Sequence, residues 1–236
     1  MKFPRFALAL AVLAAIMLLA AGAGTRLSLW SFGTGFGVLR WAAFVGLAAA
    51  ACAVVMLLLP RLRRGHGVML AVALLLGLGV AFVPWNNLRL AKTVPPIHDI
   101  STDTVHPPAF VAILPLRADA ANSAVYGGAE IARQQLAAYP DVRPLQMAVA
   151  PAQAFERALQ AAQAMGWKIV ASDPAAGRIE ATATTLWFGF KDDVVIRVQP
   201  SDTGSRIDVR SESRVGKSDV GTNARRIRAY LAKLTR

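Results

Sequence analysis

Residues 206–234 read RIDVRSESRVGKSDVGTNARRIRAYLAKL, and this stretch decides the fold of the C-terminal half. Small and apolar residues alternate with charged ones as far as Val215, which is the pattern of a β-strand with two different faces. Its charged face would carry Asp208, Arg210, Glu212 and Arg214. Gly216–Gly221 then indicates a tight turn, and the residues from about Asp219 to Leu234 indicate a closing helix.

The residues that precede this strand predict further strands, separated by short turns. We expect strands at 142–149, 167–171, 178–186 and 192–198, and helices at 128–138 and 152–165. The second of these helices carries one apolar stripe, which would face a core. Short turns between successive strands imply an antiparallel meander with helices on one face. The predicted fold class of residues 118–236 is therefore α+β, in the order β-α-β-β-β-β-α.

Three uncharged stretches of 20 residues or more lie at about 6–25, 41–60 and 67–88. Each is long enough to cross a bilayer as a helix. Residues 1–90 contain eight Lys and Arg but no Asp or Glu. The sequence therefore predicts a membrane anchor over residues 1–90 with three transmembrane helices. The first stretch could instead be a signal peptide, although it is longer than the ~7–15 apolar residues usual there.

The placement of Lys and Arg predicts the orientation of these helices. Lys2 and Arg5 precede the first stretch, and three arginines lie in the loop at 60–67. Positive residues favour the cytoplasmic side, so the N-terminus would be inside and residues 89–236 outside. We expect a multi-pass protein of the cytoplasmic (inner) membrane with a periplasmic domain and the lipid bilayer as partner. The net charge of +12 mainly flanks the apolar stretches, so we do not expect nucleic acid as a partner.

A proline-rich strap is expected at residues 91–117, between anchor and domain. Prolines disfavour a helix there and predict an extended path along the surface. The strap also contains four potential metal ligands, His98, Asp99, Asp103 and His106. Their spacing matches no closed zinc pattern. The alternative is a strap of Asx and Ser/Thr turns with no metal. No motif predicts a cofactor.

The turn before the closing helix is the candidate ligand site. Helix N-termini have unpaired N–H groups and can bind anions. The candidate anion-binding residues are Arg210, Ser213, Arg214, Lys217 and Ser218. Two observations favour a structural role instead: an Asp219 cap would compete for the same N–H groups, and the charged strand face could be a solvated cross-strand ladder.

Two functional hypotheses follow. The first is a membrane-tethered binding module of the cell envelope for an anionic ligand, a lipid headgroup or an envelope partner. The second is a metal-assisted envelope hydrolase that uses His98 to His106. Catalysis has thin support, because Ser211 and Ser213 have no identifiable base.

Three parts of the sequence resemble the DUF1499 family of uncharacterised bacterial and plastid proteins. They are Thr185–Asp193, Arg210–Gly221 and the residues Asn223, Arg226 and Ile227. The segments Pro96–Asp103 and Pro107–Phe110 are similar to its membrane-anchored bacterial branch. The resemblance implies an extracytoplasmic domain on a membrane anchor, and it implies no reaction or ligand.

Overall fold

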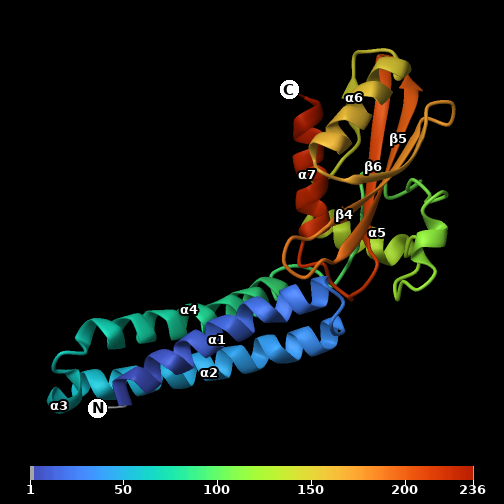
Figure 1. Cartoon of the computed structure of the whole chain (residues 1–236). Helices are drawn as coiled ribbons and strands as arrows, with labels where there is room; N and C mark the ends of the chain where they lie inside the picture. Colours follow the sequence, from blue (N-terminus) through green and yellow to red (C-terminus); the bar gives the residue numbers. More distant parts are fainter. Residues whose placement is uncertain (1–2, 236) are drawn as a thin grey trace. The chain divides into compact units, whose positions relative to one another are not determined.

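The computed structural model describes residues 3–235, which form two compact units (Figure 1). The first holds the residues up to Leu90 together with Leu186–Gly189. The second holds Ala91–Thr185 and the residues from Phe190 onward. We describe each unit by itself.

The first unit is helical. Its elements are α1 (Phe3–Arg26), α2 (Phe32–Leu58), the short α3 (Pro60–Arg63) and α4 (Gly67–Ala91). The three long helices are long and apolar enough to cross a membrane, as predicted. The second of these helices, α2, begins before residue 41, where the predicted stretch starts, because Ser31 caps it. The Ser31 hydroxyl accepts a hydrogen bond from the N–H of Thr34 at 3.2 Å. Arg40 therefore lies within α2 instead of ending a loop.

Small residues bring these helices together. Fully buried alanines lie on all three long helices, including Ala11 on α1, Ala49 on α2 and Ala73 on α4. Between α2 and α4, a Cβ atom on Gly77 would lie 2.4 Å from the backbone oxygen of Gly46. Only glycine permits this spacing, and close backbone approach is the usual basis of helix packing in membranes.

The second unit is built on a six-stranded antiparallel sheet. The strands are β1 (Asp99–Ser101), β2 (Leu145–Met147), β3 (Lys168–Asp173), β4 (Arg178–Thr184), β5 (Lys191–Ser201) and β6 (Gly204–Ser213). Their order is β1-β6-β5-β4-β3, and β2 also pairs with β6. Its helices are α5 (Gly128–Ala138), α6 (Pro151–Ala164), α7 (Thr222–Leu234) and the 3-10 helix η1 (Leu114–Arg117). The α+β class predicted from the sequence is confirmed.

Several boundaries differ from the sequence prediction, among them those of β2, which covers Leu145–Met147 and not 142–149. The closing helix begins at Thr222 and not near Asp219, because Val220 and Gly221 have φ values of 52° and 73°. Left-handed backbone cannot continue a right-handed helix. The proline-rich strap also does not follow the surface throughout, since its β1 residues are buried in the sheet, and it is not extended where it ends in the 3-10 helix η1.

The main core lies between one face of the sheet and the helices α6 and α7, which cover it together (Figure 1). The alternation of β4 turns Ile179 and Ala181 toward this core. Phe155 of α6 and Tyr230 of α7 pack against the same face. The ring of Tyr230 stacks on Trp167 with centroids 5.1 Å apart. Burial of each large apolar side chain here contributes about 1.5–3 kcal/mol of transfer free energy.

Candidate functional site

The opposite face of the sheet is charged and is the candidate functional site. Alternation along β4, β5 and β6 places Glu180, Asp193, Arg197, Asp208, Arg210 and Glu212 on it. All four carboxylates of this set are 0% exposed, and Arg210 is 2% exposed. The interpretation of this face as a solvated charge ladder is therefore wrong. A buried charge must be compensated, because its desolvation costs several kcal/mol.

We call residues 102–127, between β1 and α5, the cover segment. It contains η1 and packs on the charged face of the sheet. Phe110 and Ile113 of this segment form a second apolar cluster with Val195 of β5. The sheet therefore has a core on each face, one apolar and one mixed.

Glu180 holds the backbone of the cover segment. Its carboxylate oxygens accept hydrogen bonds from the N–H groups of Val111, Ala112 and Ile113 at 3.0–3.2 Å. The guanidinium of Arg178 lies 3.1 Å from the same carboxylate. Hydrogen bonds to an ionised acceptor are about twice as strong as neutral ones. Glu180 thereby fixes three consecutive residues of the segment on β4.

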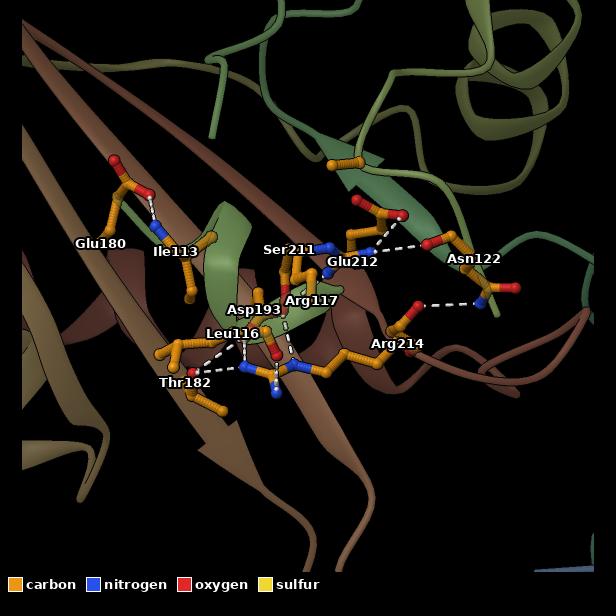
Figure 2. A network of polar contacts seen from close by, with 12 residues as sticks. Ile113, Leu116, Arg117, Asn122, Glu180, Thr182, Asp193, Ser211, Glu212 and Arg214 are labelled. Atoms are coloured by element: carbon orange, nitrogen blue, oxygen red, sulfur yellow. Dashed lines mark hydrogen bonds and ion pairs between the residues drawn. The ribbon is translucent and has the colours of Figure 1, made fainter. Parts of the chain in front are cut away.

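Arg117 of η1 is a second clamp (Figure 2). Its Nη1 donates to Asp193 at 2.7 Å, and its Nη2 donates to Glu212 at 2.9 Å. The same Nη2 donates to the carbonyl of Asn122 at 3.2 Å, within the cover segment. The two carboxylates are register partners on β5 and β6. One buried arginine therefore joins both central strands to the segment above them.

Two more arginines complete the cluster. Arg210 on β6 donates from Nε and Nη2 to Asp99 on β1 at 2.9 and 2.8 Å. Arg214, just after β6, donates from Nε and Nη2 to Asp193 at 2.8 and 2.9 Å. This forked geometry is the strong form of the arginine–carboxylate pair. With Arg117, three arginines meet three buried carboxyl groups, so the charges of the cluster balance when all three acids are ionised.

Burial shifts the protonation of two acids in this cluster. Burial, followed by the charge of Asp99, raises the pKa of Glu212 to about 8. Burial also raises the pKa of Asp99, against the lowering effect of its hydrogen bond from Arg210. Perturbed pKa values gather at functional sites and in structural ion-pair networks alike.

A second polar cluster lies on the other face of the sheet, beneath α7. Asn223 donates to the hydroxyl of Ser213 at 3.0 Å and accepts from that of Ser211 at 2.7 Å. Arg226, one turn later, forms an ion pair with Asp192. Asp192 and Asp193 thus face opposite sides of β5, as adjacent strand residues must.

A comparison with known protein families finds a matching family model. The model of the family described as "Protein of unknown function (DUF1499)" matches residues 99–234. The chain belongs to the DUF1499 family. The match begins at β1 and ends in α7, so the DUF1499 domain contains the sheet, the cover segment and both polar clusters. A search of curated proteins finds no match.

The DUF1499 domain separates the five residues predicted to bind an anion. Arg210 and Ser213 are buried and hydrogen-bonded inside the domain. Arg214 faces a buried carboxylate, while Lys217 and Ser218 lie in the turn before α7. They do not share one open surface, and their binding of an anion stays a prediction.

The N-terminus of α7 already holds a carboxylate. Asp219 accepts hydrogen bonds from the N–H groups of Gly221 at 2.8 Å and Asn223 at 2.6 Å. The competing cap considered from the sequence is therefore present. An anion would have to displace Asp219 to reach these N–H groups.

The four potential metal ligands of the strap face different partners. Asp99 binds Arg210, and Asp103 lies within 3.2 Å of the guanidinium groups of Arg197 and Arg206. His98 Nδ1 is 3.3 Å from a backbone carbonyl. Across residues 3–235, no group of three or more His, Cys, Asp or Glu side chains is arranged to hold a metal ion.

Proposed function

We propose that this protein is a membrane-tethered binding module of the cell envelope, with the DUF1499 domain on the periplasmic side of the inner membrane. Three apolar helices support the tether. The positive charges before α1 and in the loop around α3, which contains Arg61, Arg63 and Arg64, support an N-terminus inside and a domain outside. We propose an envelope protein with an apolar contact surface as the partner.

The observation that carries this proposal is the apolar exterior of the cover segment. Five aliphatic side chains of this segment are exposed: Val105, Val111, Leu114, Leu116 and Val125. In the described part of the second unit, Leu136 on α5 is the one other large apolar side chain that is exposed. Contiguous apolar patches on a domain surface mark interaction sites, and we propose that these five side chains belong to one.

The underside of the cover segment supports the same proposal. Connections longer than about 12–15 residues with little secondary structure are uncommon in compact domains, and ordered ones are usually functional. This segment is held by Glu180 and Arg117, so its conformation is fixed before a partner arrives. Such preorganisation lowers the entropy that binding must offset.

The serines of β6 favour binding over catalysis. The hydroxyl of Ser211 donates to Asn223, and that of Ser213 accepts from the same side chain. Both serines are buried. Their hydroxyls are thus used in holding α7 on the sheet.

Site-specific photo-crosslinking in intact cells tests the proposed function. A photoreactive residue at Val125, which is 79% exposed, should give a discrete protein adduct. Leu114→Asp should lower its yield by about tenfold, the effect of losing ~1.4 kcal/mol of binding free energy. A photoreactive residue at Leu136 is the matched control, because it is apolar and exposed but lies outside the segment. Equal adducts from positions 125 and 136, or none from position 125, would contradict the proposal.

A further inference from the structure

An open surface cavity of about 340 Å³ lies in the second unit at the start of α7, away from the cover segment. Its lining comes from the C-terminal end of α6, the end of β4 and the first turns of α7: Met165, Gly166, Trp167, Ala183, Thr184, Thr222, Arg225 and Arg226. The volume is within the usual range for small-ligand sites, about 300–1,000 Å³.

Arg225 gives this cavity an uncompensated positive charge. Its guanidinium donates to the carbonyl of Val220 at 3.0 Å and to the hydroxyl of Thr222 at 3.1 Å, and both acceptors are neutral. Within residues 3–235, no carboxylate forms an ion pair with it. A guanidinium has five N–H donors, so two hydrogen bonds leave capacity for a ligand.

Arg226 adds a second guanidinium in a fixed position. Its side chain is 9% exposed and is bound to Asp192, to Asn223 and, at 3.1 Å, to the hydroxyl of Ser211. These three partners hold the guanidinium of Arg226 in one position. Because Asp192 balances its charge, the net positive charge of the cavity comes from Arg225.

The N–H groups at the start of α7 do not make this site. Asp219 already accepts from the N–H groups of Gly221 and Asn223. Binding would therefore rest on side chains, namely two guanidinium groups and the hydroxyls of Thr184 and Thr222. Arginine forks match carboxylate and phosphate geometry alike, and the two additional hydroxyls can serve the further acceptor oxygens that a phosphate presents.

We infer that this cavity binds a phosphate group. Two sources share that chemistry, a phospholipid headgroup and free phosphate. This inference does not depend on the partner proposed for the cover segment.

The test uses the full chain in a non-ionic detergent, with binding followed by native mass spectrometry. The probes are inorganic phosphate and short-chain phosphatidylglycerol. Wild-type protein should bind at least one of them, and Arg225→Ala should weaken that binding by about tenfold or more. Binding of the lipid alone would identify the headgroup as the source, and binding of inorganic phosphate would identify the free anion.

Arg143→Ala is the matched control for charge. Arg143 is also exposed, and its Nε also donates to a backbone carbonyl, that of Pro140 at 2.8 Å, but it lies outside the cavity. This variant should bind both probes as wild type does. The inference is overturned if neither probe binds wild-type protein, or if the two variants weaken binding equally.

Discussion

Replacing Arg117 with alanine should lower the free energy of unfolding by about 3–5 kcal/mol, the cost of breaking a buried ion pair on one side. The side chain is 3% exposed, and its loss leaves Asp193 and Glu212 without the cation that joins them to the cover segment. Asp193 would keep Arg214 and Glu212 would keep Arg210. The change is measured by denaturant unfolding of the full chain in detergent, followed by tryptophan fluorescence.

Arg133→Ala is the control for this experiment. Arg133 also forms an ion pair, with Glu130 on α5, but the two side chains are 76% and 58% exposed. An exposed pair of this kind contributes little to stability, so Arg133→Ala should unfold at nearly the same denaturant concentration as wild type. Equal losses of unfolding free energy in the Arg117→Ala and Arg133→Ala variants would show that burial does not determine how much the Arg117 ion pairs stabilise the domain.

The second large effect is expected in the helical unit. Gly77→Ala places a Cβ atom 2.4 Å from the backbone oxygen of Gly46, so α2 and α4 must move apart. Overpacking of this kind costs about 1–3 kcal/mol. The melting temperature of the full chain in detergent should therefore fall.

Gly79 on the same helix provides the comparison. A Cβ atom added there meets nothing within 4 Å. Gly79→Ala should stay within about 0.5 kcal/mol of wild type, as is usual for a surface substitution. If both alanine variants melt at the same lowered temperature, the close approach of Gly46 and Gly77 does not hold the helices together.

Local patterns were enough to predict most of the architecture. Alternation identified the strand with Ile179 and Ala181 on its apolar face, and the helix of Phe155 was visible from its apolar stripe. The start of α2 was missed because the uncharged stretch was counted only from residue 41, after Arg40. A long arginine side chain can extend toward the membrane surface from within a helix, so its charge is a poor marker of a helix end.

The burial of the charged face could not be predicted in the same way. Alternating Arg and Glu on β6 is the pattern of an exposed face, and the sequence contains no local sign that something covers it. The covering group Arg117 is 76 residues from Asp193 and 95 from Glu212. One signal was available: the strap contained acids and apolar residues, such as Asp99 and Phe110, suited to an arginine-rich face.

The partners of the candidate anion-binding residues could not be predicted for the same reason. Arg210 and Arg214 do share a strand face, as their even spacing requires. Sequence spacing gives the direction of a side chain but not the group that it meets. By contrast, nothing in the sequence distinguishes Arg225 from the other arginines of its helix. Only the fold places it in a cavity.

Buried carboxylates fix the cover segment on the sheet. Hydrogen–deuterium exchange of the amides at 111–113 tests it most directly, since all three donate to Glu180. In the full chain these amides should exchange as slowly as those of the central strands, and Glu180→Gln should accelerate them while β5 remains protected. Rapid exchange at 111–113 in the wild-type protein, at the rate of an unstructured loop, would contradict the account.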